Sequence, residues 1–397
     1  MPEHHSDERA ARFPLGAQVR LADLNVDPYP LLDVLRREEP VSWVPETRMW
    51  FVTRRDDIVT VLRDARRFTT EAERSVIRDI FGAHMMTTDG DVALRYKRKC
   101  LHAFRADVLT GRMEPWVGAR VETLLDDAFA GGACELMGAL ATPLAVDSAL
   151  TVLGLPLEMS GRIAEWYEDF ALALANFSGE ASVRARGKGA AAAFAEAVRP
   201  RLAREEPEVL GLLSDLAHDD DDRLTDEEII ANALIILFGG IETTASMIGN
   251  TVWSLLRTGS WGRMVAEPDL RSAAIEEALR WQPAVQSITR HTTEDVEIRG
   301  VTVPRGAVVQ CMIGGANRDP DHFERPERFD PARPNAADHL SFGTGRHLCL
   351  GAHLARIEIR AVLDGLVRRA PTLTFVADVP LLRGYEFRRP VELWVTG

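Results

Sequence analysis

The strongest constraint on the fold is one helix long enough to cross a whole domain. Its start is marked by Thr225, whose side chain can cap the first amides, and by Glu228, which can reach back to complete a capping box. The helical pattern continues to Arg257, and Gly259 follows as a stop signal. About 32 residues at 1.5 Å per residue give a helix roughly 48 Å long.

The centre of this helix is weak. Gly239, Gly240, Thr243 and Thr244 lie there, and such pairs favour a local distortion. A long buried helix with a weak point at its centre indicates that something is bound at that point. Taken alone, the threonines are explained equally well by hydroxyl groups that bond back to helix carbonyls.

Composition excludes several classes of protein. The 397 residues carry 47 Lys and Arg against 60 Asp and Glu, a net charge of −13, which argues against a general nucleic-acid binder. Residues 1–20 are polar and lack the apolar stretch of a signal peptide, and the most apolar stretch, 231–241, is too short for a bilayer span. We expect a cytoplasmic protein without a membrane anchor, with an N-terminal tail over 1–20 and a single domain over 21–397.

Helical periodicity dominates from about residue 91 to residue 280. The β-branched runs are short and lie at 43–53, 295–303, 307–311 and 392–396. We therefore predict a mainly α fold with a small β region. Two further segments are predicted to be loops: 178–189, which is rich in Gly, Ser and Arg, and 218–223, whose four aspartates are better explained as a solvated loop than as a cation site.

The segment 342–351, with the sequence FGTGRHLCLG, carries the clearest chemistry. It precedes a predicted helix over 352–369, so Cys349 lies close to a helix N-terminus, where the dipole and free amides stabilise a thiolate. Gly345 permits a tight turn, and Gly351 lets a flat ligand approach the backbone. From these residues alone, Cys349 can be a nucleophile, a metal ligand or an inert buried cysteine. The four cysteines form no CxxC pair, which argues against a disulfide framework or a structural zinc.

The same segment resembles the haem-binding loop of the cytochrome P-450 family, F-x-x-G-x-H-x-C-x-G, at every fixed position. The resemblance continues in CLGAHLAR, typical of soluble bacterial members, and covers the chain from about residue 20. It implies the triangular P-450 fold, with the long central helix over a haem b (iron protoporphyrin IX) and O2 as co-substrate. It also implies that Cys349 is the iron ligand, whose thiolate favours O–O cleavage.

The resemblance assigns further residues to the cofactor. It implies that His347 donates to a haem propionate and that Phe342 packs beside the sulfur. The glycines at the cofactor are Gly239, Gly343 and Gly351.

One family feature is altered. Near Asp89 the family often has His and Arg four residues apart, and here Ala93 and Lys97 stand at those positions. Lysine keeps the charge but loses the planar fork of arginine. Arg290 matches another propionate ligand, so the implied set is Arg290, His347 and Lys97, with Arg95 as the alternative to Lys97.

Two other motifs agree in order and spacing. Glu277 and Arg280 match the family's E-x-x-R, and segment 317–333 resembles the stretch before the haem loop. Either Arg328 or Arg333 would complete this network, whose role we interpret as structural.

The third motif lies in the central helix, where GGIETT resembles A/G-G-x-D/E-T-T. The resemblance makes Glu242 and Thr243 the catalytic pair, which orders water and delivers protons to bound dioxygen.

The predicted substrate pocket is mostly apolar. Helical offsets from Thr243 place Ile235 and Phe238 towards the haem. By resemblance Met85 and Met86 lie above the pocket, Val285, Gln286 and Ile288 lie beside it, and Phe387 comes from the C-terminal hairpin. Gln286 is the one polar anchor, so the expected substrate is a medium-sized, largely apolar small molecule such as a secondary metabolite.

The predicted function is haem-thiolate monooxygenation, such as hydroxylation or epoxidation. The alternatives are oxidative coupling, desaturation or ring formation by the same oxidant, and a non-catalytic haem-thiolate sensor. The chain carries no fused reductase domain, so we expect electrons from a ferredoxin and an NAD(P)H-dependent ferredoxin reductase. The basic stretch 95–99 with Arg105 is either the face where the ferredoxin docks or a solvated helix face.

Overall fold

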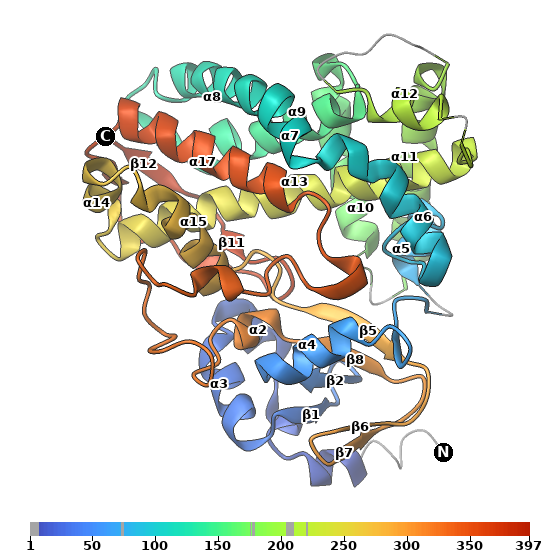
Figure 1. Cartoon of the computed structure of the whole chain (residues 1–397). Helices are drawn as coiled ribbons and strands as arrows, with labels where there is room; N and C mark the ends of the chain where they lie inside the picture. The colour runs from blue at the N-terminus through green and yellow to red at the C-terminus, as the bar shows by residue number, and fades with distance from the viewer. Residues whose placement is uncertain (1–7, 73–74, 175, 177–178, 204–209, 220) are drawn as a thin grey trace.

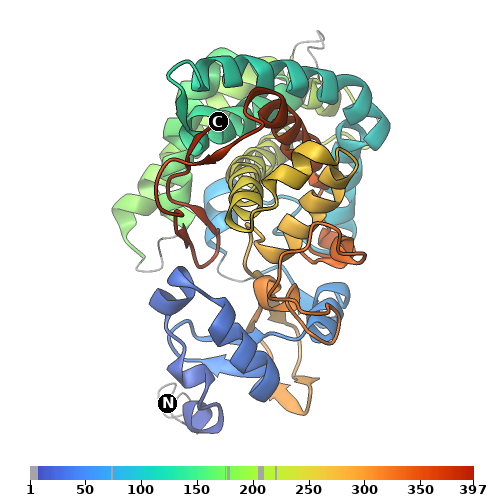
Figure 2. The same ribbon diagram turned by 90° about the vertical axis from the view of Figure 1, so that its left-hand side faces the viewer.

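The computed structural model describes all residues except 1–7, 73–74, 175, 177–178, 204–209 and 220. A large helical region lies beside a smaller region that holds the main sheet (Figures 1 and 2). The helices are α2 (Leu21–Val26), α3 (Tyr29–Glu38), α4 (Arg55–Arg63), α5 (Val76–Phe81), α6 (Gly90–Leu101), α7 (Ala106–Val108), α8 (Glu114–Ala128), α9 (Thr142–Leu153), α10 (Ser160–Leu174), α11 (Ala181–Val198), α12 (Leu212–Ala217), α13 (Asp226–Arg257), α14 (Trp261–Ala266), α15 (Leu270–Trp281), α16 (Ile313–Ala316) and α17 (Ala352–Arg369). The mainly α prediction is confirmed.

The long central helix is α13, and its predicted bounds are confirmed. Thr225 accepts the amide of Glu228, and the Glu228 carboxylate accepts the amide of Thr225, which completes the capping box. In Figure 2 the helix is seen nearly end-on with other helices around it. It is long and apolar enough to cross a membrane, but 67% of its most apolar window is buried inside the protein, as expected for a core helix.

The main sheet has the strand order β1-β2-β8-β5-β3, in which only the β2–β8 pair is parallel. Its strands are β1 (Val41–Val44), β2 (Met49–Val52), β3 (Phe68–Thr69), β5 (Ile288–Thr292) and β8 (Val308–Cys311). The predicted run 43–53 is therefore a hairpin, and its two strands bury both faces.

The remaining strands form three small sheets. They are β6 (Val296–Ile298) with β7 (Val301–Val303), β10 (Leu382–Arg383) with β11 (Arg389–Pro390), and β12 (Trp394–Thr396) between β4 (Ala133–Glu135) and β9 (Thr374–Phe375). Single turns of 3₁₀ or π helix occur at Gly16–Gln18, His102–Phe104, Leu109–Met113, Met137–Ala141, Leu157–Met159, Arg199–Arg201, Ala336–Asp338 and Gly345–His347.

Two sequence-based expectations need correction. Phe13 and Val19 are buried, and the Phe13 ring packs edge-on against Trp50, so the packed part of the chain begins before residue 20. The segment predicted as a loop over 178–189 is helical from Ala181 onwards in α11, while Ser178 lies outside the described residues. A Cβ on Gly187 would lie 2.4 Å from the Cβ of Ala173, so this glycine lets α10 and α11 pack closely.

Candidate functional site

The Cys349 loop is held in one shape by backbone contacts. Gly343 and Gly345 have φ values of +69° and +75°, which only glycine adopts readily, and the amide of Cys349 donates to the carbonyl of Phe342 at 2.9 Å. A Cβ on Gly345 would lie 2.7 Å from the carbonyl oxygen of Leu62 in α4. The predicted tight turn at Gly345 is confirmed, and close approach to α4 also requires glycine there.

Cys349 differs from the other three cysteines in its exposure. Cys100, Cys134 and Cys311 are buried, and burial raises the pKa of the Cys100 and Cys311 thiols to about 12. Cys349 is accessible to water, although the protein packed around it still raises the pKa of its thiol. The amide of Gly351 and the charges of Lys97 and Arg356 oppose that rise. Cys349 is thus the one cysteine positioned to react or to bind a metal.

Lys97 reaches the Cys349 loop and Arg95 does not. The Nζ of Lys97 donates to the carbonyls of Arg346 at 3.0 Å and Leu348 at 2.7 Å. Arg95 turns the other way and pairs with Asp222 at 2.7 Å and Glu228 at 3.1 Å. Of the two residues that the sequence left open, Lys97 is therefore the one that contacts the loop.

The two other predicted anion-binding residues differ in their partners. Arg290 lies on β5 with only 6% of its surface exposed, and it has no carboxylate within ion-pair distance in the described part of the chain. His347 Nε2 instead lies 2.8 Å from Oδ1 of Asp89. Burial works to raise the pKa of Asp89, but hydrogen bonds from His347, Thr69 and Thr70 hold it well below its ordinary value.

The predicted E-x-x-R pair is a fully buried network. Both side chains are 0% exposed, and Nε and Nη2 of Arg280 each lie 2.7 Å from a Glu277 oxygen. Nε of Arg333 lies 3.0 Å from the same carboxylate, whereas Arg328 contributes only its carbonyl. Arg333 is therefore the third member.

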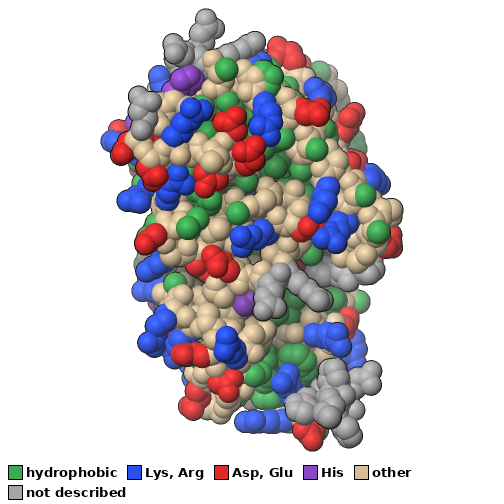
Figure 3. Space-filling view, turned by 90° about the vertical axis from the view of Figure 1, so that its right-hand side faces the viewer, with side chains coloured by type: hydrophobic (Ala, Val, Ile, Leu, Met, Phe, Trp, Pro, Cys, Tyr) green, Lys and Arg blue, Asp and Glu red, His purple; other side chains and the backbone are tan. Residues whose placement is uncertain are grey.

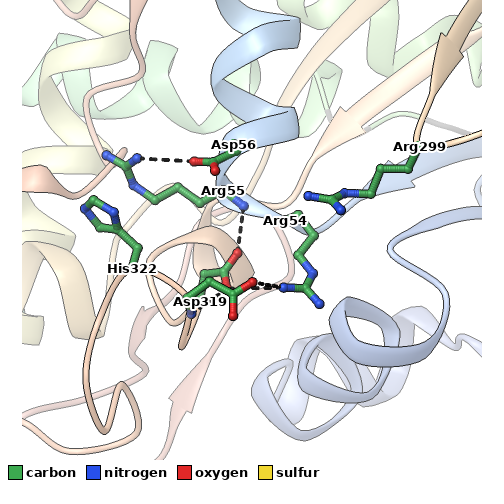
Figure 4. A pocket seen from close by; sticks show the side chains of 7 residues that line it. Arg54, Arg55, Asp56, Arg299, Asp319 and His322 are labelled. Atoms are coloured by element: carbon green, nitrogen blue, oxygen red, sulfur yellow. Dashed lines mark hydrogen bonds and ion pairs between the residues drawn. The ribbon is translucent and has the colours of Figure 1, made fainter.

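The segment before the loop ties the helical region to the sheet region. Asn317 accepts the amide of Leu340 at 2.7 Å, and Asp319 accepts the first amide of α4, from Arg55, at 3.0 Å. Figure 4 shows Asp319 beside Arg54 in a small polar hollow. The hollow is lined by Arg54, Arg55, Asp56, Arg299, Asp319, Asp321 and His322. Its charges largely pair with one another, consistent with a structural role.

At the centre of α13 the α-helical hydrogen bonding is continuous, so the weak point does not interrupt the helix. The Thr243 hydroxyl donates to the carbonyl of Gly239 at 2.6 Å. The Glu242 carboxylate lies 3.1 Å from Nε of Arg389, a residue of β11 that the sequence analysis missed. A Cβ on Gly239 would meet no other group within 4 Å, so space is open beside this turn.

Several predicted pocket residues meet around Phe238. Its ring stacks on Tyr167 with centroids 5.3 Å apart and packs edge-on against Phe387 at 6.5 Å, and Val285 pairs with Phe387 as a β-bridge. Ile235 is buried one turn earlier in α13. Tyr167 was missed because nothing in its local sequence links α10 to α13.

The other predicted pocket residues are placed differently. Met85 is partly buried against the helical core, but Met86 is 52% exposed. Ile288 lies near the Cys349 loop: a Cβ on Gly343 would be 3.4 Å from Cδ1 of Ile288. Gln286 is buried, its Nε2 donates to the Pro283 carbonyl and its Oε1 faces Gly314, so its polar atoms are directed into the protein. The expectation that Gln286 is a polar anchor for substrate is not supported.

The basic stretch on α6 is partly neutralised. Lys99 lies 2.7 Å from Asp219, and Arg95 pairs with Asp222, so the aspartate loop is folded back onto α6. Asp220 lies outside the described residues. Arg98 is exposed and has no acidic partner in the described part of the chain. On the face in Figure 3, basic and acidic side chains alternate rather than segregate.

Comparisons with known proteins agree with the fold and identify the family. A family model described as Cytochrome P450 matches residues 182–370. The biotin biosynthesis cytochrome P450 of Bacillus subtilis is 30% identical, with 93% of this chain and 96% of that protein covered. Nocardicin C N-oxygenase of Nocardia uniformis is 34% identical, with 97% and 98% covered.

Solved structures are similar over almost the whole chain. The crystal structure of CalO2 has a TM-score of 0.86 and 34% identity, with 94% of this chain and 97% of that chain covered. P450BioI, in complex with an acyl carrier protein ligated to hexadec-9Z-enoic acid, has a TM-score of 0.86 and 29% identity, with 96% and 100% covered. Sequence and structure thus lead to one conclusion: this chain belongs to the cytochrome P450 family and is a P450 monooxygenase.

Proposed function

We propose that this enzyme inserts one atom of O2 into a medium-sized, largely apolar small molecule, by hydroxylation or epoxidation of a secondary metabolite. The observation that carries the substrate class is the cluster of aromatic and aliphatic side chains around Phe238. Relatives named nocardicin C N-oxygenase and steroid C26-monooxygenase support a molecule of this size. Oxidative coupling, desaturation and ring formation use the same site and remain the alternative reactions.

The residues around Cys349 fit a haem b. Cys349 would hold the iron, because it is accessible, lies at the N-terminus of α17 and accepts the Gly351 amide. Arg290 and Lys97 would hold the propionates: Arg290 is a buried cation with no carboxylate partner among the described residues, and Lys97 lies at the loop. His347 would join them by exchanging Asp89 for a propionate. When bound, the haem supplies the oxidant from O2 and electrons.

Nonpolar and glycine contacts complete this proposed cofactor site. Phe342 would cover one side of the sulfur. Its carbonyl accepts a hydrogen bond from the Cys349 amide, which keeps the two residues close together. Gly239 has open space beside it. Gly343 and Gly351 have no side chain, so a flat ligand could approach the loop backbone closely at both positions.

Glu242 and Thr243 would move protons on the α13 side. The Thr243 hydroxyl proton is held on the Gly239 carbonyl, which leaves its oxygen lone pairs free to accept from water. The Glu242 side chain is 20% exposed, so a carboxylate that parts from Arg389 can pass protons between solvent and this side of the helix. A haem-thiolate sensor has no need of such a pair, which disfavours that alternative.

The proposed electron donor is a ferredoxin supplied by an NAD(P)H-dependent ferredoxin reductase, with all three proteins in the cytoplasm. Arg98 and Arg105 supply exposed positive charge, and Lys97, next to Arg98 on α6, contacts the Cys349 loop. Arg105 is partly offset by Asp107, 2.9 Å away. Charge of this kind steers an acidic partner.

The ligand assignment is tested by Cys349→Ala, with Cys134→Ala as the matched control. Both proteins would be loaded with haem, reduced and exposed to carbon monoxide. We expect the control to keep the thiolate-type Soret band and Cys349→Ala to lose it completely. A Cys349→Ala protein that kept the band would refute the assignment of the iron ligand. Candidate substrates can be screened on the same proteins by the shift they cause in the haem spectrum.

A further inference from the structure

A second, unassigned group of charges lies beside the buried E-x-x-R network. Glu276 and Glu277 are neighbours on α15, so their side chains leave the helix about 100° apart. Glu277 turns inward to Arg280 and Arg333, whereas Glu276 faces α17 and the Cys349 loop.

Glu276 holds Arg356 of α17 in a fixed orientation. Nε and Nη2 of Arg356 donate to the two carboxylate oxygens at 2.6 and 2.8 Å, and Nη1 donates to the Ala352 carbonyl at 3.0 Å. All three nitrogens are therefore engaged at the edge of the guanidinium group. A fork bound in this way has a fixed plane, which a lysine cannot reproduce.

The Cζ atom of this fixed guanidinium lies over the ring of Phe342. Cζ of Arg356 is 4.6 Å from the ring centroid, within the range of a cation–π contact. On another side the ring meets His339, with centroids 5.6 Å apart and an interplanar angle of 52°. Phe342 is thus enclosed by two side chains that both approach Glu276.

His339 ties this cluster to the start of the loop. Its Nδ1 accepts the amide of Ser341 at 3.1 Å, so in the neutral ring the proton is on Nε2, which lies 3.3 Å from Glu276. The side chains of His339 and Glu276 are 2% and 18% exposed. The cluster therefore contacts the loop at Ser341, through His339, and at the ring of Phe342, through Arg356. The carbonyl of Phe342 in turn accepts the amide of Cys349.

We propose that Arg356, held by Glu276, is a positioning residue for the iron ligand: it fixes the ring of Phe342 and with it the loop that presents Cys349. The proposal rests on the proposed function of Cys349 and adds to it the side chains that keep its loop in place. Without the guanidinium, Phe342 can turn away, and the hydrogen bond from the Cys349 amide to the Phe342 carbonyl can open.

The test compares haem-loaded Arg356→Gln, Arg356→Lys and wild type. Arg360→Gln is the matched control, because Arg360 lies one turn further along α17 and pairs with Asp364 at 2.8 Å. One measurement is hydrogen–deuterium exchange of the amides in the loop, including that of Cys349. The other is the rate at which the thiolate-type carbon monoxide band is lost in mild urea.

We expect both rates to rise in Arg356→Gln, by about threefold to tenfold, and to stay at the wild-type values in Arg360→Gln. Arg356→Lys should behave like Arg356→Gln, because it keeps the charge and loses the plane. If lysine restored both rates, the charge alone would matter and the positioning role would be refuted. Equal rates in Arg356→Gln and Arg360→Gln would refute it as well.

Two additions keep the test decisive. If Arg356→Gln does not load haem, Glu276→Gln removes the clamp while keeping Arg356, and it should raise loop exchange in the same direction. In a Phe342→Leu background, Arg356→Gln should have no further effect, since the ring it holds is gone. A wild-type protein without the thiolate-type band would contradict the proposed function itself, whereas unchanged variants of a wild type that has the band contradict only the role of Arg356.

Discussion

The side of the molecule that carries Cys349 and the side around the centre of α13 are built differently. Near Cys349 two carboxylates are held by ion pairs, Glu277 by two arginines and Glu276 by Arg356. Around α13, Glu242 shares a partly exposed contact with Arg389.

This difference follows from what each side has to do. A metal ligand must stay in one place, so paired charges and backbone bonds that hold one geometry are suited to the Cys349 side. Groups that move protons must exchange partners, so a carboxylate that can leave its arginine is suited to the α13 side. We therefore expect substitutions on the first side to change stability and those on the second to change proton-linked behaviour.

Glu277→Gln should have the largest effect on stability. It leaves Arg280 and Arg333 buried without a countercharge, and breaking such a buried pair costs about 3–5 kcal/mol. The free energy of unfolding in urea measures the loss. Arg328→Gln is the control, because that side chain is 67% exposed and only its carbonyl joins the network. A loss below about 1 kcal/mol in Glu277→Gln would mean that the network is not what holds this side together.

The stability contribution of His84 should depend on pH. Burial, with a smaller contribution from Arg78, lowers the pKa of His84 from 6.5 to about 3. The unfolded chain then binds a proton that the folded chain does not, so this stability is present above pH 6.5 and is lost as pH falls towards 3. The slope is at most about 1.4 kcal/mol per pH unit.

The measurement is the difference in unfolding free energy between wild type and His84→Gln from pH 7.5 to pH 5. Glutamine can accept the Met86 amide, as Nδ1 does, but does not titrate. The difference between proteins is needed because Glu358, whose pKa burial raises to about 8, titrates in the opposite sense. A difference that stays constant with pH would show that the loop of His84 opens to water before the whole protein unfolds.

Thr243→Ala tests the proton-delivery assignment. The variant should bind haem and substrate and still consume reductant, while product per electron pair falls severalfold and peroxide rises, because the hydroxyl that orders water is gone. Glu242→Ala should instead slow the whole cycle. Ser254→Ala is a matched control, since it removes a buried helix back-bond of the same length far from Glu242 in α13. Full coupling in Thr243→Ala would make Thr243 a structural helix residue.

The sequence predicted the Cys349 side better than the α13 side for a physical reason. The loop, α17 and the Glu277–Arg280 pair are contiguous or a helix turn apart, so local spacing determines them. The contact of Glu242 with Arg389 joins residues far apart in the chain and leaves no local signal.

The errors have the same origin. Gly187 indicates a loop when read locally, but in the fold it lets two helices approach. Arg356 belongs to the CLGAHLAR stretch, yet its contact with Phe342 depends on Glu276 from a different helix.

The smallest expected effect concerns the outer surface of the Cys349 side, where the pairing of charges stops. Arg98 is exposed on α6 without an acidic partner in the described part of the chain, whereas Lys99 is 15% exposed and pairs with Asp219. If a ferredoxin docks here, Arg98→Glu should slow reduction by a soluble [2Fe–2S] ferredoxin two- to threefold at low ionic strength, on the order of one surface charge pair. The effect should vanish at high salt, where surface charges are screened.

The control is Lys99→Gln, which should leave the reduction rate nearly unchanged, because the charge of Lys99 is already neutralised by Asp219. Equal rates for wild type and Arg98→Glu at every salt concentration would place the partner elsewhere, and a larger effect from Lys99→Gln would mean that the aspartate loop moves aside during docking.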